Sequence, residues 1–139
     1  MVALCADLRV AIDNSTVRIG LNEVALGLEF PPKILKLVRH RVAPRAVERV
    51  ALEAGLYEPR RAVELGLIDE MSPDPRARAE DLLATLASHP RQVYAATKRT
   101  LRAGNLDLTD EDRRAFRGRI LTGWTSPEIR ERVRAVFAR

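Results

Sequence analysis

The sequence has 139 residues, enough for one modest domain and too few for two ordinary ones. Apolar residues make up 46% and charged residues 31%, a balance that permits a packed core and argues against general disorder. The net charge of +5 arises in the last third, since residues 1–90 hold 12 basic and 13 acidic side chains and residues 91–139 hold 12 and 6. A single cysteine excludes an internal disulfide, and two histidines argue against a histidine-based metal site. Without a long apolar stretch or the basic start of a signal peptide, we expect a soluble, cytoplasmic chain.

The first thirty residues predict short strands. Apolar residues alternate with others over residues 8–12 and 16–19, with turn-forming residues between the two segments. The next segment, bracketed by Gly20 and Gly27, is mostly apolar and holds one carboxylate, Glu23. A carboxylate in such a segment either faces water at the mouth of a site or is buried for a purpose. Glu23 is therefore the first candidate functional residue.

From residue 31 onward the pattern predicts helices. Three of them begin near Pro31, Pro44 and Pro59, and we expect Gly55 and Gly66 to end the second and third. Residues 67–71 predict a strand or an extended segment. Further helices are expected after residue 75, from residue 91 toward residue 104, after a capping signal at residues 109–112, and from residue 126 to the end. Because two or three short strands form no stable sheet alone, the chain has the pattern of the second half of a larger fold.

Four sequence blocks occur in an order and at separations that are typical of one family. They are ALCADLRVA (3–11), IGLNEVALGL (19–28), RAVELGLID (61–69) and AATK (95–98). Together they resemble the enoyl-CoA hydratase/isomerase, or crotonase, superfamily over residues 2–104, and the helix after residue 126 resembles the family's C-terminal helix. The resemblance implies an α/β, partial crotonase-like fold. Residues 1–72 would form the end of its ββα spiral with the catalytic-loop region, and residues 73–139 a helical C-terminal region for cover or oligomerisation.

The resemblance also implies a chemistry. Family members hold the thioester carbonyl of an acyl-CoA with two backbone N–H groups, which stabilise an enolate while carboxylates move protons. Glu23 matches one of two catalytic glutamates of the hydratases, and Glu29, an extra carboxylate near the site, is the second expected catalytic residue. The expected contacts with substrate or coenzyme A come from Gly20, Leu21 and Lys98. We expect no cofactor apart from the coenzyme A of the substrate, and no nucleic-acid or membrane partner. If the chain is completed, the resemblance implies a homotrimer or homohexamer.

The sequence also departs from the family pattern. The other catalytic glutamate would align with Met1, and the glycine that supplies one oxyanion N–H would lie just before it. The second oxyanion N–H belongs to the N-terminal half of the family's fold. We therefore expect the 139-residue chain to be inactive by itself. The loop after Gly27 lacks the family's glycines and carries Glu29 instead.

The sequence leaves three functions open. They are enoyl-CoA hydration or double-bond migration, a non-catalytic remnant or partner-binding helical protein, and a basic helical module that binds RNA or DNA through residues 91–139. The third is disfavoured because the basic residues there are interleaved with apolar ones. Among single residues, Glu29 could be an ordinary loop carboxylate, Lys98 a solvated helix lysine, and Cys5 a small buried hydrophobe.

Overall fold

The computed structural model describes residues 1–137, and its strands form two small sheets. Strand β1 (Val10–Ile12) pairs in parallel with β4 (Glu70–Ser72), and β2 (Ile19–Gly20) pairs antiparallel with β3 (Leu56–Tyr57). The strands predicted at 8–12, 16–19 and 67–71 correspond to β1, β2 and β4. Strand β3 was not predicted, because two residues are too few for an alternating pattern.

The first helices lie before and between these strands in the sequence. They are η1 (Val2–Cys5), η2 (Val24–Leu26), α1 (Pro32–Arg41), η3 (Pro44–Ala46), α2 (Val47–Leu52) and α3 (Pro59–Leu65), where η1, η2 and η3 are 3₁₀-helices. Prolines begin α1, η3 and α3, as predicted. Gly66 ends α3 at φ 77°, also as predicted. The stop predicted at Gly55 is wrong, because α2 ends earlier and Ala54 takes the positive φ of 51°.

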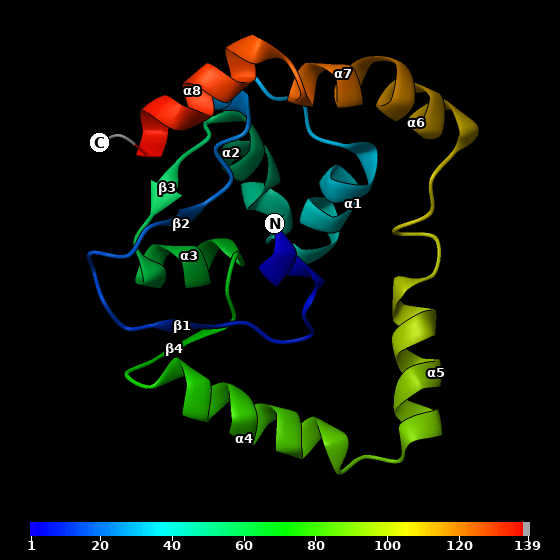
Figure 1. The fold of residues 1–139 in the computed structure, drawn as a ribbon. Coiled ribbons are helices and arrows are strands. Elements are labelled where there is room, and N and C mark those ends of the chain that lie inside the picture. The colour runs from blue at the N-terminus through cyan, green and yellow to red at the C-terminus, as the bar shows by residue number, and fades with distance from the viewer. Residues whose placement is uncertain (138–139) are drawn as a thin grey trace.

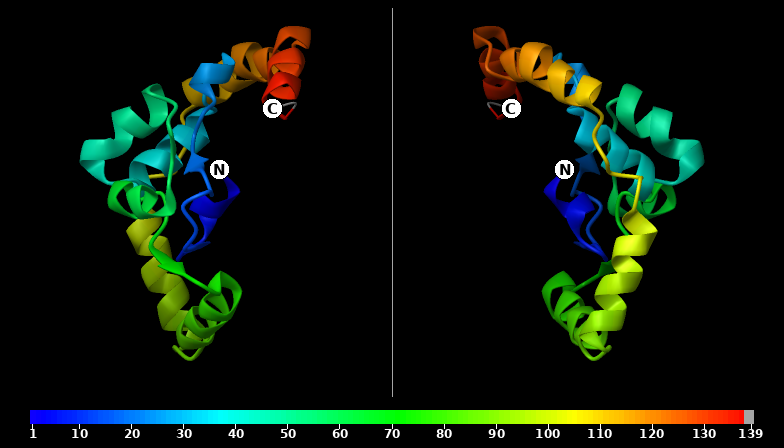
Figure 2. Two further views of the ribbon diagram at one scale, coloured as in Figure 1. Left: turned by 90° about the vertical axis from the view of Figure 1, so that its left-hand side faces the viewer. Right: turned by 90° about the vertical axis from the view of Figure 1, so that its right-hand side faces the viewer.

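Helices make up the rest of the chain. They are α4 (Pro75–Ala87), α5 (Arg91–Arg102), α6 (Asp110–Ala115), the π-helical turn η4 (Phe116–Ile120), α7 (Leu121–Trp124) and α8 (Pro127–Phe137). The predicted capping signal is confirmed, since Thr109 and Asp112 form a reciprocal capping box at the start of α6. The views in Figures 1 and 2 place α6, α7 and α8 at one end of the molecule and α4 and α5 at the other, with α1, α2 and α3 between.

The hydrophobic core lies in the first half of the chain. Val38 of α1 and Val50 of α2 are completely buried, and the core cluster also includes Ala62 and Leu65 of α3. Helices α4 and α5 contribute no buried residue. The predicted division into residues 1–72 and 73–139 stays a prediction. The last two residues of the second segment, 138 and 139, lie outside the described part. The expectation that Cys5 is buried is wrong: Cys5 is exposed, while its neighbour Leu4 faces the core.

Within residues 1–137, no helix combines the length and the apolar character needed to cross a membrane.

Candidate active site

The turn at residues 23–28 fixes the backbone of Glu23. Strand β2 leads into it, and Glu23 directly precedes η2. The carbonyl oxygen of Glu23 accepts hydrogen bonds from the N–H groups of Leu26, at 3.0 Å, and Leu28, at 2.8 Å. Gly27 closes the turn at φ 77°, a conformation that favours glycine. Two hydrogen bonds and one left-handed residue therefore hold the backbone from which the carboxylate projects; we call this segment the Glu23 turn.

The side chain of Glu23 is buried but incompletely satisfied. Glu23 is only 8% exposed. Its Oε2 atom is buried and has no hydrogen-bond partner among the described residues. A buried polar atom without a partner costs stability, so a purely structural role gives no reason for it. A buried carboxylate oxygen without a partner makes Glu23 the strongest candidate for chemistry among the residues predicted from the sequence.

Glu29, the second predicted carboxylate, is engaged on the surface. Its two oxygens accept hydrogen bonds from Arg119 of η4, from Nε at 2.9 Å and from Nη2 at 2.6 Å. These hydrogen bonds raise the pKa of the Arg119 guanidinium. The carbonyl oxygen of Glu29 accepts a further bond from Trp124 Nε1 at 2.8 Å. These hydrogen bonds join η4 and α7 to the segment that follows the Glu23 turn. The catalytic role expected for Glu29 stays a prediction.

Gly20 and Leu21 occupy tightly packed positions just before Glu23. A Cβ atom at Gly20 would lie 2.0 Å from the carbonyl oxygen of Gly55, so only glycine allows β2 and β3 to approach each other. Leu21 is buried in the core at 3% exposure. Both residues support the path of the chain into the Glu23 turn. Their predicted contact with substrate stays a prediction.

Lys98 binds a carboxylate of this chain. Its ammonium group pairs with Asp7, which also accepts hydrogen bonds from the Tyr94 hydroxyl at 2.8 Å and from Arg102 Nη2 at 2.6 Å. Burial alone would raise the pKa of Asp7, but the hydrogen bonds from Lys98 and Tyr94 hold it below its ordinary value. The third cation near Asp7 is Arg41, whose Nη2 lies 3.9 Å from the carboxylate. We call Asp7 and its four partners the Asp7 cluster. No sequence pattern indicates it, because its members are up to 95 residues apart.

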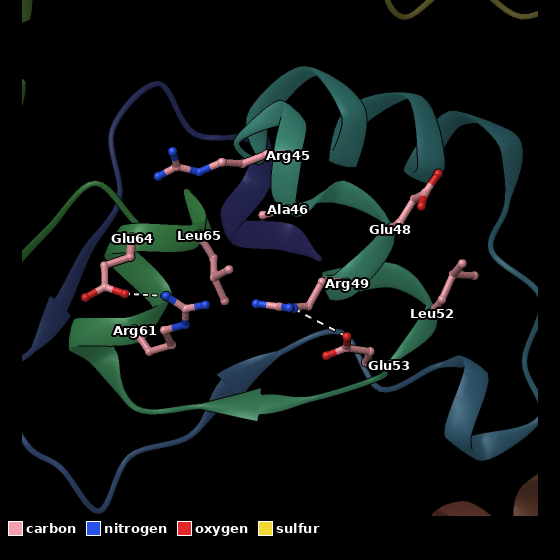
Figure 3. A pocket seen from close by; sticks show the side chains of 9 residues that line it. All are labelled: Arg45, Ala46, Glu48, Arg49, Leu52, Glu53, Arg61, Glu64 and Leu65. Atoms are coloured by element: carbon pink, nitrogen blue, oxygen red, sulfur yellow. Dashed lines mark hydrogen bonds and ion pairs between the residues drawn. The ribbon is translucent and has the colours of Figure 1, made fainter.

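A separate cavity of about 480 Å³ lies between α2 and α3. Figure 3 shows the guanidinium groups of Arg49 and Arg61 pointing into it from opposite sides. Arg49 is paired with Glu53 at 3.3 Å, and Arg61 is paired with Glu64. None of the site residues predicted from the sequence lines this cavity. It is therefore distinct from the environment of Glu23.

Sequence comparisons give a consistent result. The model of the family described as enoyl-CoA hydratase/isomerase matches residues 1–138. Mitochondrial enoyl-CoA delta isomerase 1 of Rattus norvegicus is 33% identical over 111 residues, which cover 76% of this chain and 38% of the relative. The protein of the same name from Homo sapiens is 33% identical over 118 residues, or 81% of this chain and 38% of the relative. The chain thus spans less than half the length of the curated relatives it matches.

Solved structures agree. A probable enoyl-CoA hydratase from Mycobacterium tuberculosis superposes with a TM-score of 0.69 at 31% identity, over 75% of this chain and 44% of that one. The human mitochondrial delta3-delta2-enoyl-CoA isomerase superposes with a TM-score of 0.83 over 99% of this chain and 54% of that one. At 24% identity the second likeness shows the fold alone. The human and rat proteins are named as mitochondrial, and the cytoplasmic location expected for this chain stays a prediction.

Proposed function

The chain belongs to the enoyl-CoA hydratase/isomerase family, and on this premise we propose that it carries the general acid/base carboxylate, Glu23, of an enzyme acting on acyl-CoA thioesters. The partial crotonase-like α/β fold expected from the sequence is confirmed by the solved structures. The observation that supports Glu23 most strongly is the buried Oε2 atom without a partner. Such an atom can face a substrate carbon without first breaking a hydrogen bond within the protein.

The chemistry is proton transfer next to a thioester. When a proton leaves the carbon beside the carbonyl, negative charge develops on the carbonyl oxygen, and fixed N–H dipoles stabilise the resulting enolate. A single carboxylate can take a proton from one carbon and return it to another, which moves the double bond with no net change in atoms. Hydration in the family pattern uses two carboxylates, and the second would align with Met1. We therefore favour double-bond migration over hydration, in line with relatives named as isomerases.

We propose that the Asp7 cluster contacts the anionic part of the substrate. Three cations, Arg41, Lys98 and Arg102, lie around the single carboxylate of Asp7. The surplus of positive charge favours phosphate groups such as those of coenzyme A. Lys98 would thus combine a structural ion pair with a role in binding, while Gly20 and Leu21 shape the approach to Glu23. No cofactor other than the coenzyme A of the substrate is proposed.

Activity is proposed for a larger assembly than this chain alone. By the family pattern, both oxyanion N–H donors lie outside these 139 residues, and the chain spans 38% of its curated relatives. We expect the completed protein to form a homotrimer or homohexamer. The second candidate function, a non-catalytic or partner-binding protein, is favoured by apolar side chains on α4 and α5 that remain exposed, namely Leu83, Val93 and Leu101.

The test compares two preparations. One is the 139-residue chain, and the other is the same chain joined to the N-terminal half of a solved family member. Appearance of the conjugated enoyl thioester absorbance from a β,γ-enoyl-CoA measures isomerisation, and loss of that absorbance in water measures hydration. The proposal expects isomerisation by the completed protein and no activity from the chain alone. A completed, folded protein without either activity would favour the non-catalytic candidate.

A further inference from the structure

Helix α8 lies against the Glu23 turn. Its Arg132 Nη1 donates a hydrogen bond to the carbonyl oxygen of Leu26 at 3.2 Å. A Cβ atom at Gly27 would lie 2.2 Å from the same nitrogen and 3.7 Å from Ile129 Cδ1. Figure 1 shows α8 beside the segment that follows β2. The missing side chain of Gly27 therefore makes the space that the Arg132 guanidinium fills.

The backbone of Leu26 links this contact to Glu23. The N–H of Leu26 binds the carbonyl oxygen of Glu23, and the carbonyl oxygen of Leu26 binds Arg132. The Oε2 atom of Glu23 has no hydrogen-bond partner within the described residues, so this carboxylate is positioned by the backbone of its turn and by the packing around it. Any loosening of the turn therefore changes where the carboxylate points.

Helix α8 is itself held from two sides. Ile129 is 8% exposed, so the helix is seated by an apolar contact as well as by Arg132. Earlier in the same C-terminal segment, Arg119 and Trp124 both bind Glu29, which lies just beyond the turn. The hydrogen bonds to Glu29 thus hold the chain that leads into α8 next to the Glu23 turn.

We infer that Arg132 is a positioning residue for Glu23: by holding the Leu26 carbonyl oxygen in the space above Gly27, it fixes the turn from which the Glu23 carboxylate projects. The inference rests on the proposed function of Glu23 as the proton-transfer group. Arg132 acts through the backbone and takes no part in proton transfer.

The direct test is the chemical accessibility of Glu23. The 139-residue chain is treated with a carbodiimide and an amine, and modification of Glu23 is followed by mass spectrometry in wild type and in Arg132→Gln. We expect labelling of Glu23 to rise about fivefold, the change that corresponds to the typical net contribution of one hydrogen bond, about 1 kcal/mol. Arg132→Lys, which keeps a charged donor, should restore most of the protection. The melting temperature should stay near that of the wild type.

The matched control is Arg134→Gln, which removes an arginine from the same helix. Arg134 is exposed and makes no hydrogen bond or ion pair within residues 1–137. Unchanged labelling of Glu23 in Arg132→Gln, or an equal rise in Arg134→Gln, would overturn the inference.

If Arg132→Gln does not fold, hydrogen exchange of the wild type tests the inference instead. The amides of Leu26 and Leu28 must then open together with those of α8, and independent opening overturns the inference.

A kinetic test separates this inference from the proposed function. In the completed protein, Arg132→Gln should lower kcat about fivefold and leave KM unchanged, because the carboxylate is misdirected while the substrate still binds. If Glu23→Gln kept full turnover, the proposed function would fail, although the labelling result would still stand. If labelling did not respond to Arg132→Gln, the positioning role would fail with the proposed function intact.

Discussion

The side chain of Arg9 donates two hydrogen bonds to the carboxylate of Asp69, from Nε at 2.8 Å and from Nη2 at 2.9 Å. Its Nη1 atom donates two more, to the carbonyl oxygens of Gly66 and Leu67, each at 3.0 Å. Arg9 is 6% exposed, so nearly all of this charge is withdrawn from water. The pair joins the start of β1 to the segment between α3 and β4, and so links two of the four blocks on which the family resemblance rests.

Removing one partner of this pair should destabilise the chain. Asp69→Asn keeps the size of the side chain but leaves the buried Arg9 guanidinium without its counter-charge. We expect a loss of about 2 kcal/mol in the free energy of unfolding, below the range for fully buried pairs because the Asp69 side chain is 33% exposed. Urea denaturation measures the loss. Glu53→Gln, in the exposed pair with Arg49, is the control, and an equal effect of both substitutions would contradict this account.

The Asp7 cluster should make stability depend on acid pH. The folded state holds the pKa of Asp7 below its ordinary value, so protonation favours the unfolded chain. The contribution of Asp7 is complete above the ordinary carboxyl range and is lost as the pH falls through the lowered pKa. Wild type should therefore exceed Asp7→Asn by about 1 kcal/mol in unfolding free energy near pH 6, and the difference should shrink as the pH falls below the ordinary carboxyl range. A difference that persists in acid would contradict the assignment.

Two glycines with the same backbone conformation should respond differently to alanine. Gly66 and Gly104 have φ values of 77° and 75°. A Cβ atom at Gly66 would lie 2.9 Å from the backbone nitrogen of Ala43, whereas one at Gly104 would have no neighbour within 4 Å. In both alanine variants the left-handed conformation lowers the free energy of unfolding by about 1 kcal/mol. Gly66→Ala should cost at least about 1 kcal/mol more in thermal unfolding, since the approach of Ala43 is blocked. Equal losses of stability in Gly66→Ala and Gly104→Ala would show that the contact between Gly66 and Ala43 does not contribute.

The isolated chain should self-associate. Val93 and Leu101 of α5 are 64% and 67% exposed, and α5 buries none of its residues. Exposed apolar helix faces and unpaired strand edges favour association. Light scattering should report oligomers or aggregates of the 139-residue chain, and the double variant Val93→Glu, Leu101→Glu should reduce their mass. A monomeric mass of the wild type together with cooperative unfolding would be evidence against this expectation.

Features with a local cause were predicted from the sequence. Proline at the start of α3, glycine at its end and the capping box at Thr109 each act within a few residues, so the sequence displays them directly. Cys5 shows the limit of such reasoning. An apolar run predicts burial, but η1 turns Leu4 toward the core and Cys5 away from it.

The candidate site was predicted in part. Glu23 was identified because a lone carboxylate in an apolar segment is visible in the sequence, and it is indeed buried. The partners of Glu29 and Lys98 lie 90 and 91 residues away. No periodicity or spacing reports contacts at such separations, so the ion pairs of these two residues emerge only from the fold.

The most direct test of the central claim is the turnover of Glu23→Gln in the completed protein. The amide is close to the carboxylate in size and cannot accept the proton, so acyl-CoA binding should persist. Turnover should fall about 10²-fold or more, the usual scale for loss of a general acid/base. Glu29→Gln is the matched control, because its carboxylate is paired with Arg119, and it should reduce turnover far less. Unchanged turnover in Glu23→Gln, or a larger loss in Glu29→Gln, would contradict the assignment of Glu23 as the proton-transfer group.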